Sequence, residues 1–485
     1  MITGGTSGIG LATALRLRDR YRLAVTYAHD CQRAAAAEVN LGPESRAFAF
    51  DLGSDVEVQA GYLQIKEHFG SEPEVLVNCA GVKGMQRFFL QGCTLKGCQE
   101  LMNLHYFGTL RMVKQVLPGM YSPRRGSIIN LSSVSACGGY RGLIGYSEAK
   151  AAVECFTKNL AVEVGHRGLT VSCVRPALVE TALTEEMAAQ MDPASVNRPR
   201  GHFVLAGVRR RREWPDCYPG WGERGDESPH DAFGGLMQPP LALISGGTSG
   251  IGLATARRLV CDHRLALLYA RDGERAANLE REFGDPDRVK TFCLDVGCDE
   301  AVDAGYAALC QHFGEAPGVL VNSAGVARFQ RFFVQGKDLS HAQEMMNVNY
   351  FGSMRLIRKV MPAMYSRRRG CIVNLGSVSG LGGSACVIGY AESKAALACL
   401  TRNLAMEVAR RGLSVNCVSP GRVATPMTEE LLGQFAPESI NYPLGRAIQA
   451  AEVARVIEML VRIGPAVNGQ ELVVDGGTSV ARLQP

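Results

Sequence analysis

Short runs of apolar residues alternate with longer stretches of mixed polarity along most of the chain. In the C-terminal half, the runs read LALI, LALLYA, VKTFCLDV, VLVNSAG, CIVNLGS, SVNCVSP and ELVVD. Runs that are apolar at nearly every position are typical of strands buried on both faces, whereas half-exposed strands alternate. Because helical stretches separate the runs, the pattern predicts a parallel sheet with helices on both of its faces, which is an α/β fold.

The same pattern occurs twice in the chain. Three phrases of the N-terminal half return almost unchanged: TGGTSGIGLATA (3–14) as SGGTSGIGLATA (245–256), VLVNCAGV (75–82) as VLVNSAGV (319–326), and IGYSEAKAA (144–152) as IGYAESKAA (388–396). A repeat of this length indicates a duplicated domain, because solenoid repeats are only about 20–50 residues long. We therefore expect two Rossmann-type doubly wound parallel sheets in tandem.

The N-terminal copy is the shorter of the two. It begins later within the repeat, and its match to the C-terminal copy stops near residue 201. Beyond the corresponding point, the C-terminal copy carries a helical stripe of Val453, Val456, Ile457 and Leu460, followed by the strand-like run QELVVDGG. We therefore expect the first sheet to lack its last strand and helix. At roughly 25 cal/mol per Å² this removes several kcal/mol of stability, so the first copy should depend on the second or on the linker.

The segment between the copies has a different composition. It holds the arginine run 209–212, both Trp residues and many Gly and Pro, which indicates an exposed linker. We expect domains at 1–201 and 241–485, joined by a linker at 202–240. The arginine run could instead be a targeting or docking patch, and a frameshifted or intron-derived stretch would have a similar composition.

The overall composition is that of a globular protein, with 46% hydrophobic residues, 20% charged residues and a formal net charge of +5. No basic face or reading motif indicates nucleic acid, and no apolar run reaches the ~18 residues that a membrane span needs. The start MITGG has no signal-peptide pattern, so we expect a cytoplasmic protein that binds neither nucleic acid nor membrane. The 16 Cys residues show no metal-ligand spacing, so we expect reduced thiols and no metal site.

A glycine-rich turn follows the first strand of each copy. It reads Gly246-x3-Gly250-x-Gly252 in the C-terminal copy and Gly4-x3-Gly8-x-Gly10 in the N-terminal copy. Glycines allow a tight turn and let the backbone approach a pyrophosphate, which binds the N–H groups at the start of the next helix. A turn of this kind between a strand and a helix predicts a dinucleotide site in each copy.

The end of the second strand bears on the choice of cofactor. Arg271 stands there in the C-terminal copy and His29 in the N-terminal copy. An acidic residue at this place usually holds the ribose 2′-OH of NAD, whereas a cation suits the 2′-phosphate of NADP. Arg271 therefore favours NADP(H), assisted by Ser249 of the turn. Asp272 and Asp30, one residue later, keep NAD(H) open, and Arg271 could also be a plain surface residue.

The most specific signal is a Tyr and a Lys four residues apart, Tyr390 and Lys394, which places both side chains on one helix face. A free Tyr titrates near ~10, and we expect the adjacent ammonium to lower this pKa by about 1–3, which makes the phenol a usable proton donor near neutral pH. Ser377 lies upstream at the end of a strand, where its hydroxyl could hold a carbonyl oxygen. The N-terminal copy repeats the set as Ser133, Tyr146 and Lys150.

Both copies resemble the short-chain dehydrogenase/reductase family, and the likeness is strongest to its 3-oxoacyl-acyl-carrier-protein reductases. The C-terminal copy holds the family's motifs in order, from the glycine turn to the final Val474-Asp475-Gly476-Gly477. The resemblance implies an NAD(P)-dependent oxidoreductase acting on CH–OH or C=O groups. Tyr390 would be the general acid and base, and Ser377 would orient the substrate carbonyl. Lys394 would hold the nicotinamide ribose, and Asn349 would support a water in a proton relay.

The resemblance also implies a set of cofactor-binding residues. Asp295 and its counterpart Asp51 follow the third strand, placed to take the adenine amino group. In the C-terminal copy the set is Gly246, Ser249, Gly250, Ile251, Gly252, Arg271, Asp295, Val296, Asn322, Ala324, Gly325, Tyr390, Lys394, Pro420, Gly421, Val423 and Thr425. In the N-terminal copy it is Gly4, Gly8, Gly10, Asp51 and Asn78.

The N-terminal copy departs from the family pattern at its relay position. The phrase LMNLHYFG places His105 where MMNVNYFG of the C-terminal copy has Asn349. A His side chain can still donate and accept hydrogen bonds. His105 is therefore kept as a candidate catalytic residue of the N-terminal copy.

Two further departures bear on the relative activity of the copies. Ser323 and Cys79 replace the second Asn of the family's Asn-Asn-Ala-Gly motif, which we expect to be mild. Pro176–Ala177 replaces Pro420–Gly421 beside the expected nicotinamide, where an added methyl can crowd a backbone approach. Together with the missing strand and helix, this predicts that the C-terminal copy carries most of the activity.

Cofactor motifs do not name a substrate. We expect an NADP(H)-dependent ketoreductase for a 3-oxoacyl thioester or a similar ketone. One alternative is a dehydrogenase of a sugar, a polyol or another secondary alcohol, and another is a non-catalytic NADP-binding or scaffold protein. Basic turns at 367–369 and 410–411, repeated at 124–125 and Arg167, could dock an acidic acyl-carrier protein or be solvated loop charge. Residues 426–439 are expected to form the substrate lid.

Assembly is predicted from the resemblance alone. Family members commonly pair through the helices that bear the Asn and the Tyr. We therefore expect the two copies to form an internal pseudo-dimer, and further homo-oligomerisation stays open.

Overall fold

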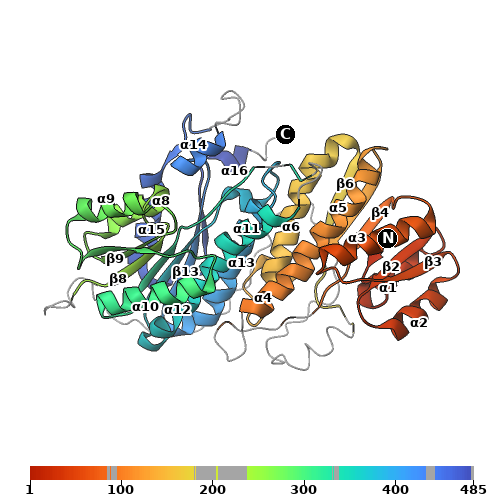
Figure 1. The fold of residues 1–485 in the computed structure, drawn as a ribbon, viewed down its shortest axis with the longest axis horizontal. Helices are drawn as coiled ribbons and strands as arrows, with labels where there is room; N and C mark the ends of the chain where they lie inside the picture. The colour runs from red at the N-terminus through yellow and green to blue at the C-terminus, as the bar shows by residue number, and fades with distance from the viewer. Residues whose placement is uncertain are drawn as a thin grey trace, which may run out of the picture.

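The structure is a computed structural model of the chain, and it describes residues 1–82, 84, 88, 95–179, 181, 204–205, 238–329, 331–332, 338–432 and 443–481 (Figure 1). Two α/β units lie at opposite ends of the molecule, each with its own sheet. The arginine run 209–212 and both Trp residues lie outside the described residues, as does most of the expected linker.

The N-terminal unit is built on parallel strands in the order β3-β2-β1-β4-β5-β6. The strands are β1 Ile2–Thr3, β2 Leu23–Tyr27, β3 Ser45–Ala49, β4 Val75–Asn78, β5 Gly126–Leu131 and β6 Leu169–Arg175. The helices are α1 Gly8–Leu17, α2 Cys31–Leu41, α3 Asp55–Phe69, α4 Leu95–Met102, α5 Gly108–Tyr121 and α6 Tyr146–Val164. The strand order reverses between β1 and β4, which is where doubly wound sheets bind ligands at the carboxyl ends of their strands.

The C-terminal unit repeats this order as β10-β9-β8-β11-β12-β13-β16. Its strands are β8 Leu241–Ser245, β9 Arg264–Tyr269, β10 Val289–Cys293, β11 Val319–Asn322, β12 Gly370–Leu375, β13 Leu413–Pro420 and β16 Glu471–Val474, and β14 Val423–Ala424 pairs separately with β15 Ile448–Gln449. Its helices are α8 Gly250–Leu259, α9 Gly273–Phe283, α10 Asp299–Phe313, α11 Ser340–Met346, α12 Gly352–Arg367, α13 Tyr390–Val408, α14 Pro426–Leu432, α15 Ala450–Ile463 and α16 Thr478–Ala481.

The apolar runs of the C-terminal half form these strands, and the predicted fold class is confirmed. All pairings within this sheet are parallel, and every residue of β8, β11 and β13 is buried. The predicted helical stripe forms on α15, where Val453, Ile457 and Leu460 are fully buried and Val456 is partly buried. Strands that are covered by helices on both faces need apolar side chains at every position, which explains the runs.

The two sheets differ at their last edge. In the N-terminal sheet, β7 Val204–Leu205 pairs antiparallel with β6, at the place that β16 takes in the C-terminal sheet. Within the part of the chain that the structure describes, the first sheet thus lacks the parallel last strand, as expected, but the predicted linker contributes two residues to its edge. Among the described residues, no helix follows β6 in the way that α15 follows β13.

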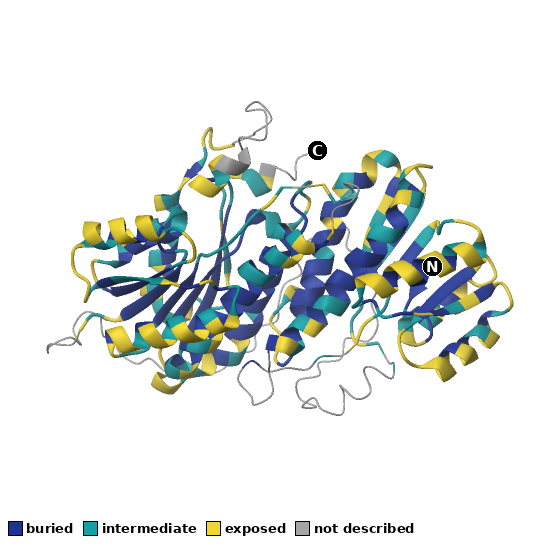
Figure 2. Cartoon of the chain, viewed as in Figure 1, coloured by how far each residue is buried: buried dark blue, intermediate teal, exposed yellow. Residues whose placement is uncertain are grey.

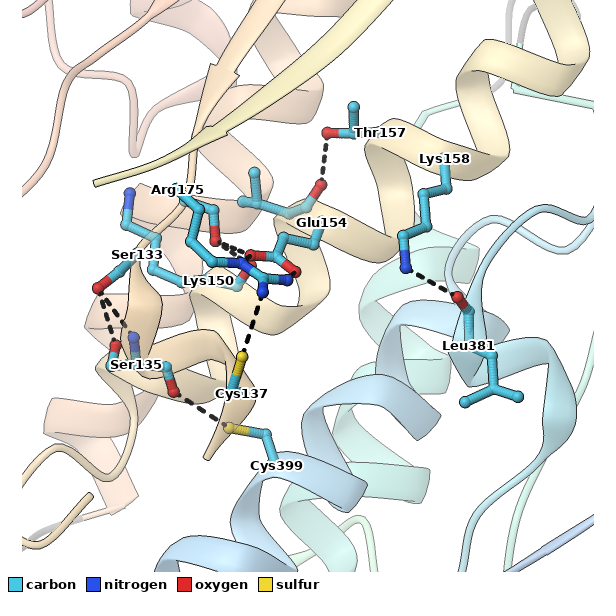
Figure 3. A network of polar contacts seen from close by, with 12 residues as sticks. Ser133, Ser135, Cys137, Lys150, Glu154, Thr157, Lys158, Arg175, Leu381 and Cys399 are labelled. Carbon is cyan, nitrogen blue, oxygen red and sulfur yellow. Dashed lines mark hydrogen bonds and ion pairs between the residues drawn. The ribbon is translucent and has the colours of Figure 1, made fainter. Parts of the chain in front are cut away.

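An ion pair at the end of β6 has no counterpart in the C-terminal copy (Figure 3). Arg175 pairs with Glu154 of α6, and its Nε donates to Glu154 Oε1 at 2.7 Å. The C-terminal copy has Ser419 and Ala398 at these two positions, and the Ser419 hydroxyl instead donates to Glu471 of β16 at 2.7 Å. At this position the N-terminal copy therefore has the Arg175–Glu154 ion pair, and the C-terminal copy has a hydrogen bond from Ser419 to its last strand.

The two units pack through α6 and α13, which lie side by side in the buried middle of the molecule (Figures 1 and 2). Hydrogen bonds between these helices come in matched pairs. Asn159 Nδ2 donates to Glu392 Oε1, and Asn403 Nδ2 donates to Glu148 Oε1, each at 2.8 Å. A contact and its repeat-related counterpart are what a two-fold axis produces, so the copies meet with the symmetry of a dimer inside one chain.

The described residues show neither a membrane helix nor a metal cluster. Within these ranges, no helix is long and apolar enough to cross a bilayer. No group of three or more His, Cys, Asp or Glu side chains there could hold a metal ion. The cysteines that the structure describes are all free thiols.

The interface carboxyls make stability depend on pH. Burial raises the pKa of Glu148 and of Glu392 from 4.5 to about 7, and hydrogen bonds from the two Asn side chains offset this only in part. Between these values the folded protein binds protons more strongly than the unfolded chain. The stabilisation is therefore complete below pH ~4.5 and is lost as the pH rises through about 7. We expect the melting temperature of the Glu148→Gln/Glu392→Gln variant to fall less than that of the wild type between about pH 5 and pH 8.

Differential scanning calorimetry across this pH range measures the effect. Glu67→Gln, at an exposed position of α3, is the control and should keep the wild-type slope. Parallel pH profiles for the wild type and the double variant would contradict the prediction.

Candidate active site

Ser377, Tyr390 and Lys394 come together at the carboxyl edge of the C-terminal sheet. β12 ends at Leu375, Ser377 follows in extended backbone, and a short 3-10 turn leads toward α13, which begins at Tyr390. Tyr390 forms a side-chain hydrogen bond with Ser377. Lys394 Nζ lies 5.8 Å from the centroid of the Tyr390 ring. The structure thus brings together the three side chains that the sequence singled out.

The electrostatics of the Tyr differ from the expectation. Burial raises the pKa of Tyr390, and the hydrogen bond with Ser377 offsets this only in part. The Lys394 ammonium donates to the carbonyl of Leu375 at 2.8 Å, and burial lowers the pKa of Lys394 to about 8. The net pKa shift of Tyr390 is therefore upward, opposite in direction to the expected lowering, because desolvation disfavours the charged form of both groups.

Asn349 lies in a π-helical turn, Asn347–Phe351, between α11 and α12. Its Nδ2 donates to the carbonyl of Val326 at 3.0 Å and to Ser393 Oγ at 2.9 Å, and its Oδ1 accepts from the Val326 N–H at 2.8 Å. The amide thus fastens the loop after β11 to α13, close to Tyr390. Sequence analysis missed Ser393, although its change to Ala149 in the N-terminal copy was visible in the repeat. The water relay through Asn349 stays a prediction.

A cleft of about 180 Å³ opens beside Tyr390 and Lys394. Most of its wall consists of residues that the sequence predicts as cofactor ligands: Gly246, Ser249, Gly250, Ile251, Ala324, Gly325, Tyr390, Lys394, Pro420 and Thr425. The wall is completed by Ser323, Leu375, Gly376, Pro426 and Met427. Pro426 and Met427 begin α14, the described part of the predicted lid, and residues 433–439 of that lid lie outside the described residues.

The glycine turn fits a dinucleotide. Gly246 and Gly250 adopt φ of +63° and +50°, and a Cβ on Gly252 would lie 2.2 Å from the carbonyl oxygen of Gly246. Ser249, at the N-cap of α8, makes no side-chain capping bond to the helix. The first N–H groups of α8 therefore have no side-chain cap and border the cleft, which is the arrangement that binds a pyrophosphate.

Ser245 holds the floor of this site and was not singled out from the sequence. Its Oγ accepts from the backbone N–H groups of Ser323 and Ala324, each at 3.1 Å. Thr3 makes the equivalent contacts in the N-terminal copy. A hydroxyl residue directly before both glycine turns was the signal available in the sequence. These contacts use backbone N–H groups. The presence of Ser323 in place of the second Asn of the family's Asn-Asn-Ala-Gly motif therefore leaves them intact.

The two residues that bear on cofactor choice have different surroundings. Asp272 caps α9, where its Oδ1 accepts from the Arg275 N–H at 2.9 Å and its Oδ2 pairs with the Arg275 guanidinium at 2.9 Å. Arg271 is exposed and has no ion-pair partner among the described residues. Both carboxylate oxygens of Asp272 are thus engaged, whereas the Arg271 cation is available.

The remaining predicted ligands lie away from the cleft wall. Asp295 and Val296 follow β10, and Asp295 is exposed with its Oδ1 accepting from the Gly297 N–H at 2.8 Å. Asn322 is buried at the end of β11 and donates to Asn374 Oδ1 at 2.8 Å. Val423 is buried in the small β14–β15 pair.

Gly421 serves the last strand of the sheet. Its N–H donates to the carbonyl of Val474 at 2.9 Å, and a Cβ at this position would lie 2.9 Å from Asp475 Cα. No counterpart of Asp475 is present near Ala177 among the described residues of the N-terminal copy. The expectation that Ala177 crowds a nicotinamide stays a prediction, and within the protein the close approach at Gly421 is the one to Asp475.

The N-terminal copy reproduces the Ser-Tyr-Lys geometry. Lys150 Nζ lies 5.8 Å from the centroid of the Tyr146 ring and donates to the carbonyl of Leu131 at 2.9 Å. Burial raises the pKa of Tyr146, offset in part by a hydrogen bond with Ser133, and burial lowers the pKa of Lys150 to about 8. The predicted ligands Gly4, Gly8, Gly10, Asp51 and Asn78 hold the same places as their C-terminal counterparts.

His105 and Ala149 both differ from their C-terminal counterparts, which are Asn349 and Ser393. His105 Nε2 lies 2.9 Å from the carbonyl oxygen of Val82, and its ring packs edge-to-face on Tyr146 with centroids 5.2 Å apart. Burial lowers the pKa of His105 well below its usual value, so the ring is neutral and Nε2 acts as the donor. Ala149 stands where the C-terminal copy has Ser393, so the hydroxyl that Asn349 contacts there is absent. His105 thus keeps the contact with the loop after β4 and loses the hydrogen bond to α6.

The basic turns lie at the opposite edge of the sheet from Ser377. Residues 367–369 end α12 and precede β12, whereas Ser377 follows β12, and a strand of this length spans about 20 Å. Arg367 Nη1 donates to the carbonyl of Ala316 at 2.9 Å, and the Arg411 guanidinium stacks 4.3 Å from the centroid of the Tyr365 ring. These contacts favour loop charge that serves the fold over a carrier-protein dock beside the site.

Comparisons with known proteins agree with the two-copy arrangement. The profile of the family described as short chain dehydrogenase matches residues 1–192 and 240–434. The chain is 37% identical over 254 residues to 3-oxoacyl-[acyl-carrier-protein] reductase FabG of Pseudomonas aeruginosa, which covers 50% of this chain and 98% of that protein. It is 35% identical over 263 residues to the granaticin polyketide synthase putative ketoacyl reductase 1 of Streptomyces violaceoruber, covering 50% of this chain and 94% of that protein.

Solved structures also match about half of the chain. The crystal structure of levodione reductase is 31% identical and covers 50% of this chain and 98% of its own, with a TM-score of 0.46. The family profile matches more than half of the residues, in two segments that correspond to the two α/β units. The chain therefore belongs to the short chain dehydrogenase family, as an oxidoreductase of C=O and CH–OH groups that carries the family's domain twice.

Proposed function

We propose that the protein is an NADP(H)-dependent ketoreductase whose C-terminal copy, residues 241–485, holds the main active site. Residues 1–201 form the second, partnering copy, and residues 202–240 link the two. The observation that carries the proposal is that Tyr390 and Lys394 line the same cleft as the glycine turn. Ketone reduction needs a hydride from the dinucleotide and a proton from an acid. Because the dinucleotide site and Tyr390 share one cleft, both could reach the same carbonyl group.

The side chains have distinct roles in this proposal. NADPH would supply the hydride that the carbonyl carbon accepts. Ser377 holds the carbonyl oxygen, and Tyr390 donates its phenolic proton to that oxygen as negative charge develops there. The Lys394 ammonium, held by the Leu375 carbonyl, stabilises the phenolate left on Tyr390 until a proton returns from solvent. The product is a secondary alcohol.

The substrate proposed is a 3-oxoacyl thioester, carried on acyl-carrier protein or coenzyme A. The support is the similarity to proteins named as reductases of 3-oxoacyl-acyl-carrier protein and of ketoacyl groups. Because the basic turns lie at the far edge of the sheet, a carrier protein would have to approach from the side of α14, where the cleft opens.

The purified full chain tests the proposal with acetoacetyl-CoA as the probe substrate. NADPH oxidation followed by absorbance should depend on acetoacetyl-CoA and saturate with it. Turnover of a polyol with NADP⁺ in place of acetoacetyl-CoA reduction would assign the protein to secondary-alcohol oxidation. Binding of NADPH without turnover of either substrate would make it a non-catalytic nucleotide-binding protein.

We expect Arg271→Ala to raise the KM for NADPH by about 10- to 100-fold and to leave the KM for NADH nearly unchanged. A hydrogen-bonded ion pair with the 2′-phosphate is worth about 1.5–3 kcal/mol, and only NADPH has that phosphate. His29→Ala changes the equivalent position of the N-terminal copy and is the matched control. An equal rise of both KM values would show that Arg271 does not read the 2′-phosphate.

A further inference from the structure

The described residues leave a groove of about 1000 Å³ that runs along α1 and continues past the short strand β1 to Ile65 and Phe69 of α3, where Glu72 and Glu74 also line it. Its lining is mostly apolar, with α1 as one wall and the sheet as the floor. The wall and floor include Ile9, Thr13 and Leu17 of α1, Ile129 and Leu131 of β5, and Val174 of β6. An apolar hollow of this volume is large enough to receive a ligand or the side chains of a partner segment.

The C-terminal copy shows what fits the corresponding face. There α15 packs against α8, β12 and β13, which are the counterparts of α1, β5 and β6. Leu259 and Val418 beneath α15 are 0% exposed, whereas their counterparts Leu17 and Val174 are only half-buried. The same backbone frame therefore accommodates an amphipathic helix when one is present.

The rim of the groove carries an unpaired charge. In the C-terminal copy, Arg258 of α8 forms an ion pair with Glu458 of α15. The repeat places Arg16 of α1 at the position of Arg258. Arg16 is exposed, and it has no ion-pair partner among the described residues. An acidic residue at the place of Glu458 would pair with it.

At a second position on the rim, the charge has opposite signs in the two copies. Asp262 follows α8 and pairs with Arg462 of α15 at 3.1 Å. Its counterpart in the N-terminal copy is Arg20, which is exposed. A helix in this groove would therefore need an acidic residue where α15 has Arg462, since a basic residue there would face a like charge.

We propose that this groove is a docking site for an amphipathic α-helix of a partner protein. The helix presents an apolar stripe to the sheet and acidic residues to Arg16 and Arg20. Among the described residues, the counterpart helix α15 already covers the C-terminal copy, and the proposal assigns the occupant to another molecule. The rim has Arg20 where the C-terminal copy has Asp262, so the partner helix needs a different charge pattern from that of α15.

A labelled peptide with the sequence 449–464 and the change Arg462→Glu tests the proposal against the full-length protein. It keeps the Gln449–Glu452 capping box that favours its helix. Fluorescence anisotropy should show saturable binding. The protein variant Arg16→Glu/Arg20→Glu should bind this peptide at least tenfold more weakly. A peptide with Glu458→Arg and the native Arg462 should bind the Arg16→Glu/Arg20→Glu protein with the affinity that the first peptide has for the wild type.

Controls separate docking from non-specific adhesion. A peptide that also carries Ile457→Asp loses the centre of the stripe and should not bind. Unchanged melting temperatures show that the charge-reversal variant is folded. Absence of saturable binding, or equal binding to the wild type and the variant, overturns the proposal. A fluorescent fatty acid that fills the groove and resists displacement by the peptide assigns it to a small apolar ligand instead and also overturns the proposal.

Discussion

Replacing Tyr390 by Phe is expected to lower the rate of NADPH-dependent reduction of acetoacetyl-CoA by about 10²- to 10⁴-fold, the range that general acid catalysis contributes. The phenol is the only hydroxyl removed, and the ring keeps its packing at the start of α13. The hydride can still be delivered, but the developing oxyanion then receives no proton from the protein. The affinity for NADPH should change little, so the loss should appear in kcat.

Tyr146→Phe is the matched control because the N-terminal copy has the same side-chain geometry. We expect it to retain most of the wild-type activity. If Tyr146→Phe abolished turnover and Tyr390→Phe did not, the active copy would be the N-terminal one. Thermal melting of both variants establishes that any loss is chemical and does not come from unfolding.

The second large effect is expected at the glycine turn. Gly252→Ala would place a Cβ 2.2 Å from the carbonyl oxygen of Gly246, so the turn has to shift away from α8. The N–H groups that would hold the pyrophosphate lie in this turn, and a 1 Å displacement lengthens several charge-assisted hydrogen bonds at once. We expect the Kd for NADPH, measured by nucleotide fluorescence, to rise by at least about tenfold, equivalent to about 1.4 kcal/mol.

Gly10→Ala makes the same change in the N-terminal copy, where the Cβ would lie 2.3 Å from the carbonyl oxygen of Gly4. If the C-terminal copy is the main site, this variant should keep catalytic turnover while its own copy loses nucleotide affinity. Two binding phases in the wild type and one in each variant would show that both copies bind cofactor. Wild-type affinity in Gly252→Ala would contradict the assignment of the turn.

The sequence predicted well those features that depend on neighbours along the chain. The apolar runs predict buried strands because a strand covered on both faces has no polar side. The glycine turn is recognisable because a strand, a turn and a helix follow one another within a dozen residues. Tyr390 and Lys394 are placed together because they are one helical turn apart. The structure adds the cleft that joins the turn to the pair.

Features that join distant parts of the chain were not predicted correctly. The pKa of Tyr390 is raised because burial outweighs the hydrogen bond with Ser377, and burial depends on everything that packs over α13. The close approach of Asp475 to Gly421 was not visible in the sequence, because the two lie 54 positions apart along the chain. Asp272 looked free to bind a ribose until its contacts with Arg275 were known.

The duplicated doubly wound fold, the dinucleotide turn and the Tyr-Lys helix could therefore be predicted from the sequence, because each is encoded by spacing within a short segment. Tertiary structure alone decided which charges are satisfied and which surfaces are covered. The pairing of Glu148 with Asn403, the packing of His105 on Tyr146 and the open groove along α1 all depend on segments that fold against one another from far apart. Local periodicity carries no information about such contacts, since their energies arise only when the packed surfaces meet.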